Sequence, residues 1–148
     1  MVDLSKIFAE QQASEIEWNG ALFSLYELPS DVSRLRVQFR ARASDLRQGI
    51  RLKIRGGEME ANGVFAPDLV LWQDASPELL DVQVRWHAKG ARSLRVWNCW
   101  EVNGVAHAWL GNSGMRVERV SPRSLILRCS DGRGEPDFDD LVVGISSE

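Results

Sequence analysis

The sequence predicts an all-β fold: a two-sheet antiparallel β-sandwich, jelly-roll-like, with a short N-terminal helix. Three observations support this class. After residue 14, apolar and polar residues alternate in many short segments, which is the pattern of half-buried strands. Glycine, proline, asparagine, aspartate and serine separate these segments. Only one stretch, near the N-terminus, has helical spacing. A closed β-barrel is the alternative arrangement of the same strands.

We expect one domain over residues 1–148, with residues 1–14 as a helical extension. A length of 148 residues is typical of a single domain, and the 44% hydrophobic content is sufficient for a packed core. The sequence has no internal repeat, low-complexity tract or linker that would divide it.

The elements follow in chain order. Residues 3–12 are expected to form the helix, because Leu4, Ile7 and Phe8 recur at helical spacing. Residues 17–28 have strand character and are interrupted at Asn19-Gly20, which favours a pair of strands or one broken strand. Strict alternation then predicts strands over 34–42 and 50–55, each with basic side chains on the outward face.

The remaining strands are marked by turn residues and by hydrophobicity. Gly56-Gly57 and Asn62-Gly63 predict turns. Residues 68–72 are apolar throughout, which is typical of a central strand. Further strands are expected at 81–87, 94–102, 105–110, 115–120, 124–129 and 139–145.

Three of the six tryptophans lie between residues 94 and 110, on either side of Asn103-Gly104. Asn-Gly is typical of a two-residue hairpin turn, because both residues tolerate positive φ. This apex predicts a definite register between the two strands. The expected pairs are Val102–Val105, Glu101–Ala106, Trp100–His107, Cys99–Ala108, Asn98–Trp109 and Trp97–Leu110.

The register places different side chains on the two faces of this hairpin. The face with Trp97 and Cys99 is small and apolar, and we expect it to pack against the second sheet. The other face combines indoles with an amide and an imidazole, as a carbohydrate-binding surface requires. The predicted ligand-binding residues are Asn98, Trp100, His107 and Trp109. The same four residues also suit a purely structural role, in which the asparagine and the histidine satisfy each other in the core.

Basic residues are concentrated between positions 34 and 55, where eight occur and Asp45 alone opposes them. If the two strands there formed a hairpin, arginines would lie opposite arginines, which is destabilising without compensation. Acidic strands around Glu15, Glu17 and Glu27, or around Glu58 and Glu60, would supply that compensation. The alternative is an anionic or protein partner. Its predicted binding residues are Arg36, Arg40, Arg42, Arg51, Lys53 and Arg55.

An acidic loop, "DGRGEPDFDD" at 131–140, lacks the spacing of a calcium-binding loop, so we expect turn geometry there and no metal. The stretch that closes the chain, "FDDLVVGI" at 138–145, resembles the final strand of galactose-binding-like β-sandwich modules. That resemblance implies a jelly-roll sandwich and, with it, carbohydrate binding. It spans eight residues and carries over no binding residue.

Net charge, the length of apolar runs and the cysteine content indicate which classes of partner and which cellular compartment to expect. A net charge of −3 and an acidic pI argue against nucleic acid as the partner, and no apolar run is long enough to cross a membrane. Cys99 and Cys129 are expected to be buried, reduced thiols of a cytoplasmic protein, and an inter-strand disulfide is the alternative.

No catalytic or cofactor motif is present, so we expect a non-catalytic binding or interaction domain without a cofactor. Its partner would be a glycan or other small molecule, or a protein, and the exposed sheet edges also suit a homodimer. A small hydrolase built from scattered carboxylates is the third hypothesis.

Overall fold

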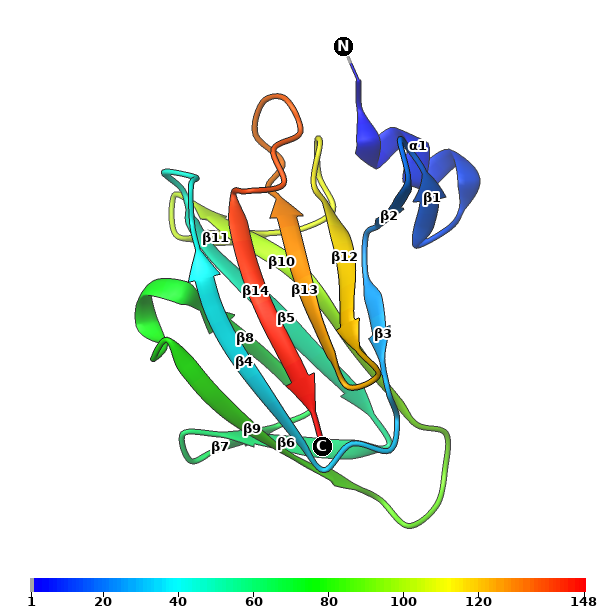
Figure 1. Cartoon of the computed structure of the whole chain (residues 1–148), viewed down its shortest axis with the longest axis vertical. Helices are drawn as coiled ribbons and strands as arrows, with labels where there is room; N and C mark the ends of the chain where they lie inside the picture. Colours follow the sequence, from blue (N-terminus) through cyan, green and yellow to red (C-terminus); the bar gives the residue numbers. More distant parts are fainter. Residues whose placement is uncertain (1) are drawn as a thin grey trace.

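The computed structural model describes residues 2–148 and confirms the predicted β-sandwich (Figure 1). The larger sheet has the spatial order β1 (Glu15–Glu17), β2 (Ala21–Phe23), β12 (Gly114–Ser121), β13 (Ser124–Ser130), β14 (Leu141–Ser147), β4 (Arg34–Ala41), β9 (Leu79–Trp86), β6 (Gly57–Ala61) and β7 (Val64–Ala66). The smaller sheet has β11 (Val105–His107), β10 (Ser93–Val102), β5 (Arg47–Arg55) and β8 (Asp68–Trp72), and β3 (Tyr26–Leu28) also pairs with β10. Both sheets are antiparallel. A 3₁₀ turn, η1 (Gln73–Ala75), follows β8.

The core lies between the two sheets and comes from the inward positions of the alternating strands. Leu35 and Val37 of β4, with Ile50 and Leu52 of β5, are fully buried. The outward positions of the same strands carry charged side chains, as the period-two pattern predicted. Cys99 and Cys129 are both buried and unpaired, as expected.

The N-terminal helix α1 (Leu4–Gln11) matches the predicted one closely. Asp3 caps it, because its Oδ1 accepts a hydrogen bond from the Lys6 amide at 3.3 Å. Leu4 and Phe8 are buried in a second, smaller hydrophobic cluster with residues of the β1–β2 hairpin. The helix and this hairpin lie at one end of the sandwich, beside the start of β12 (Figure 1).

One expectation about strand placement is wrong, and the hairpin considered for the two basic strands does not form. Residues 68–72 form β8 at the edge of the smaller sheet and are not central, because β8 pairs with β5 alone. The basic strands β4 and β5 do not form a hairpin, because they belong to different sheets: β4 pairs with β14 and β9, and β5 with β10 and β8. Alternation shows that a strand has two faces, but it does not identify the strand's neighbours.

No helix among the described residues is long and apolar enough to span a membrane.

Candidate functional site

Strand β10 leaves part of one edge without a strand partner. Its other edge pairs with β5 along Ser93–Glu101. On the edge in question, β3 pairs with residues 94–96 and β11 with residues 100–102. Neither strand reaches residues 97–99. The indole of Trp109 lies at this gap, where its Nε1 donates to the carbonyl oxygen of Ser24 at 2.8 Å, just before β3.

The gap arises because β11 pairs with β10 over only three residues. The predicted hairpin is therefore correct at its apex and wrong beyond the third pair. Asn103 and Gly104 have φ of 51° and 78°, and the three pairs from Val102–Val105 to Trp100–His107 form as expected. The outer pairs Cys99–Ala108, Asn98–Trp109 and Trp97–Leu110 do not form, because β11 ends at His107. Trp109 then takes a left-handed φ of 59°, which turns the chain away from β10.

The two faces of β10 are also exchanged relative to the prediction. Asn98 points inward, where its Nδ2 donates to the carbonyl oxygen of Ser130 on β13 at 2.9 Å. Trp100 lies on the same inward face, against the backbone of Gly132. Trp97 lies on the outward face, with the Arg51 guanidinium 5.7 Å from its ring centre. It is nevertheless buried, because the ring of Trp109 packs on it with centroids 4.8 Å apart.

The four predicted ligand-binding residues therefore do not share one surface. Asn98 is buried and paired, as the structural alternative required, but with a backbone carbonyl and not with His107. Trp100 and His107 do meet, with nearly parallel rings 6.4 Å apart at one end of the sandwich. Trp109 lines a different pocket. The residues fall into three separate environments because the face of β10 that carries Asn98 and Trp100 is the inward one, and because the pairing ends at His107.

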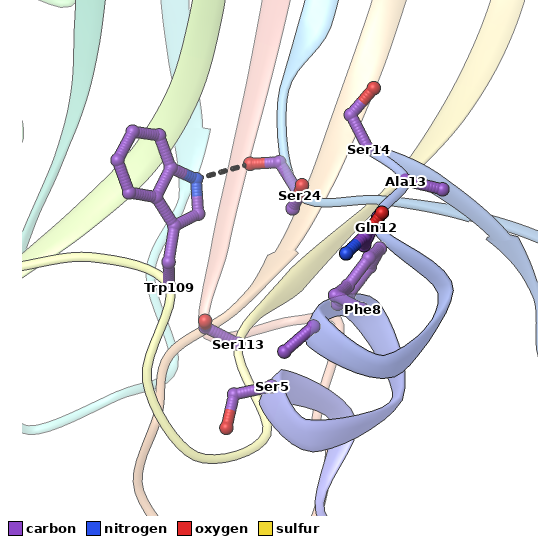
Figure 2. Close-up of a pocket in the computed structure, with 9 residues that line it drawn as sticks. Ser5, Phe8, Gln12, Ala13, Ser14, Ser24, Trp109 and Ser113 are labelled. Atoms are coloured by element: carbon purple, nitrogen blue, oxygen red, sulfur yellow. Dashed lines mark hydrogen bonds between the residues drawn. The ribbon is translucent and has the colours of Figure 1, made fainter.

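The pocket at Trp109 lies between helix α1 and the connection from β11 to β12, and has a volume of about 400 Å³. Figure 2 shows the indole on one side and the end of α1 with the following turn on the other. The lining residues are Ser5, Phe8, Ala9, Gln12, Ala13, Ser14, Ser24, Trp109 and Ser113. None of these side chains is charged, although 26% of the chain is Asp, Glu, Lys or Arg.

Most of the hydroxyl groups that line this pocket have no hydrogen-bond partner among the described residues. Among the described residues, the hydroxyls of Ser14, Ser24 and Ser113 make no hydrogen bond, whereas Ser5 donates to Asp3. The Gln12 side chain is exposed at the end of the helix, on a left-handed backbone with φ of 49°. Trp109 is 46% exposed, with its Nε1 committed to Ser24, so the ring offers hydrophobic surface to a ligand. The pocket thus combines an indole surface with free hydroxyl and amide groups.

The walls of the pocket are held together by hydrogen bonds that backbone amides donate at the start of α1. The amide of Leu4 donates to Oδ1 of Asn112 at 3.0 Å, and the amide of Ser5 donates to the Gly111 carbonyl at 2.9 Å. Both donors belong to the first turn of the helix, where amides have no partner within the helix. The connection from β11 to β12 therefore holds the helix against the sandwich.

Of the residues that line this pocket, only Trp109 was predicted as a ligand-binding residue from the sequence. The four serines and Gln12 come from segments up to about a hundred residues apart and belong to no recognisable motif. Serine is also frequent in ordinary turns, so its presence in the sequence carried no signal of a site.

The predicted anion-binding residues are divided between two sheets. Arg36 pairs with Asp81, and Arg51 forms two hydrogen bonds with Asp68, which hold the pKa of the Asp68 carboxyl below its usual value. Within residues 2–148 the remaining members make no ion pair: Arg40, Arg42, Lys53 and Arg55. The positive charge of the basic strands was expected to be balanced by the segments around Glu15, Glu17 and Glu27 or around Glu58 and Glu60. Most of its carboxylate partners instead lie in or beside β8 and β9.

The acidic loop places two of its carboxylates in the interior. Oδ2 of Asp131 accepts hydrogen bonds from Ser44 and from the buried Gln48, and Oδ2 of Asp140 accepts from the Asp131 amide at 3.0 Å. Burial, with the nearby carboxylates of Asp131 and Asp137, raises the pKa of Asp140 to about 6. No group of three or more metal-ligating side chains is found within residues 2–148. The carboxylate of Asp131 thus joins this loop to residues before and within β5, and that of Asp140 connects the two ends of the loop.

No protein-family model matches the chain, and no curated protein matches it.

Proposed function

We propose that this protein binds a neutral carbohydrate in the pocket between α1 and Trp109. The observation that carries the proposal is the composition of the lining, which combines a half-exposed indole with hydroxyl and amide groups and has no charged side chain. An indole packs well against the apolar C–H face of a sugar ring. Serine and glutamine side chains provide both donors and acceptors for its hydroxyl groups.

The absence of charge within this lining selects among ligand classes. A phosphate or carboxylate would have to give up its hydration without a cation to replace it, which is strongly unfavourable. A neutral polyhydroxylated molecule exchanges its water for side-chain hydrogen bonds of similar strength. The volume of about 400 Å³ lies within the range of small-molecule sites and suits one or two sugar rings.

The test is a titration of the full chain with neutral mono- and oligosaccharides, followed by tryptophan fluorescence and by calorimetry. Trp109→Ala should weaken binding more than tenfold, because it removes the stacking surface, and Trp109→Phe should retain part of the affinity. Gln12→Asn shortens the amide side chain, and asparagine still tolerates the left-handed backbone there, so a smaller loss is expected.

Trp86→Phe is the matched control. Trp86 lies on β9, where its Nε1 donates to the Val32 carbonyl, and it does not line the pocket. It should leave sugar affinity unchanged. The proposal is wrong if no neutral sugar binds, or if a sugar binds equally well to a folded Trp109→Ala variant.

A further inference from the structure

A second pocket, of about 420 Å³, lies beside the β10–β11 hairpin and has a different chemical character. The hairpin and three connections converge on it: the one that leads into β5, the one from β11 to β12, and the loop after β13. Its lining consists of Leu46, Trp100, Val102, His107, Leu110, Gly132 and Arg133. This volume is also within the range of small-molecule sites.

Flat surfaces make up much of this second pocket. The imidazole of His107 lies nearly parallel to the indole of Trp100, with an angle of 23° between the ring planes. Gly132 lies directly against the same indole. A Cβ on this glycine would be 2.5 Å from Cζ2 of Trp100. Trp100 is 4% exposed, so it supports the partly exposed imidazole of His107, which is the flat surface open to a ligand. Such a wall favours a planar, apolar ligand.

Both polar side chains of the lining, His107 and Arg133, carry nitrogen donors, and no carboxylate lines the pocket. Arg133 is paired with Asp45 at 3.0 Å, but these side chains are 63% and 81% exposed, so the pair is weak and easily exchanged. Two other carboxylates of this region already have partners, because Glu101 binds Arg47 and Asp131 binds Ser44 and Gln48. A carboxylate on the ligand would replace Asp45 on Arg133.

We propose that this second pocket binds a planar aromatic carboxylate, with its rings against the imidazole of His107, which Trp100 supports from behind, and its carboxylate on the guanidinium of Arg133. A guanidinium binds a carboxylate through two parallel hydrogen bonds, which gives both affinity and orientation. This site differs from the proposed sugar pocket in place and in ligand class. The two pockets share only the connection that carries Trp109 and Leu110, and those side chains line different pockets.

The experiment compares 2-naphthoate with its neutral amide, 2-naphthamide, on the full chain, by calorimetry and by NMR shifts of the Trp100 indole N–H. We expect naphthoate to bind more tightly than naphthamide. Arg133→Gln should weaken naphthoate binding about three- to fivefold and leave naphthamide binding unchanged. Asp45→Asn should strengthen naphthoate binding about two- to fivefold, because it frees Arg133. Both substituted side chains are exposed, so both variants should fold normally.

Several results would overturn the proposal: binding of neither compound at millimolar concentration, equal binding of both, or no effect of Arg133→Gln on naphthoate. Trp109→Ala should leave naphthoate affinity unchanged, and Arg133→Gln should leave sugar affinity unchanged. Failure of one site is therefore distinguishable from failure of the other.

Discussion

Asn98 connects the two sheets through a single buried hydrogen bond. It is 3% exposed on the inward face of β10, and its Nδ2 reaches the Ser130 carbonyl on β13 of the other sheet. A buried carbonyl that loses its donor retains its full desolvation penalty. The amide of Asn98 is therefore structural, and its neighbours Trp97 and Trp100 take opposite sides of the same strand.

Asn98→Ala should lower the free energy of unfolding by about 1–3 kcal/mol, because it leaves the Ser130 carbonyl unpaired and opens a small cavity. Urea unfolding measures the change. Gln83→Ala, at an exposed position of β9, is the control and should change stability by less than about 0.5 kcal/mol. Equal stability of Asn98→Ala and the wild-type protein would show that water or another group satisfies Ser130.

Among the elements, the connections after β11 and after β13 pack closely against each other. A Cβ on Gly111 would lie 2.2 Å from the carbonyl oxygen of Gly132, and one on Gly132 would lie 2.6 Å from the Leu110 carbonyl oxygen. Nδ2 of Asn112 also donates to the Gly134 carbonyl at 2.8 Å. The close approach of these two backbones supports both candidate pockets, because Trp109 and Leu110 belong to the first connection.

Gly132→Ala should destabilise the protein by about 1–3 kcal/mol, because its Cβ would collide with Trp100 and with backbone that has little room to move. Thermal unfolding measures the loss, and amide exchange should show faster opening around residues 109–113. Gly144→Ala is the matched control, since the atoms nearest to its Cβ would belong to the flexible side chain of Arg40. If the two variants have the same stability, the connections are less tightly packed than described.

For the whole molecule, the charges produce a pH dependence with two opposing parts. Hydrogen bonds from Ser5, Arg123 and Arg51 lower the pKa values of Asp3, Asp31 and Asp68, so these contributions to stability are lost as pH falls. Asp140 acts in the opposite direction. Its pKa is raised to about 6 in the folded protein, so folding is favoured when it is protonated, and that advantage is lost as pH rises.

Asp140→Asn should therefore gain stability relative to the wild-type protein as pH increases. The difference in unfolding free energy between variant and wild type should increase by about 1–2 kcal/mol between pH about 4 and pH about 7. Urea unfolding at a series of pH values measures it. Asp139→Asn, on the exposed neighbouring residue, is the control and should show no such increase. A difference for Asp140→Asn that does not change with pH would contradict the burial of this carboxyl.

Much of the fold could be predicted from local patterns. Period-two alternation identified β4, β5 and β9, and the helical spacing of Leu4 and Phe8 identified α1. Asn103-Gly104 predicted the apex and the first three pairs of the hairpin, because the two-residue turn depends only on the tolerance of these two residues for positive φ. These features depend on residues close together in the chain.

The partners of β4 and β5, the inward face of β10 and the end of β11 at His107 were decided only by the tertiary structure. Alternation distinguishes the two faces of a strand, but which face is covered depends on the sheet that packs against it. The Trp109 pocket also could not be predicted, because its hydroxyl groups come from segments that are far apart in the chain. Local residue patterns were enough to predict the fold class and most elements, because backbone preference and hydrophobic period act over neighbouring residues. The tertiary structure determined the site, because its surface exists only after non-local strands and the helix have packed.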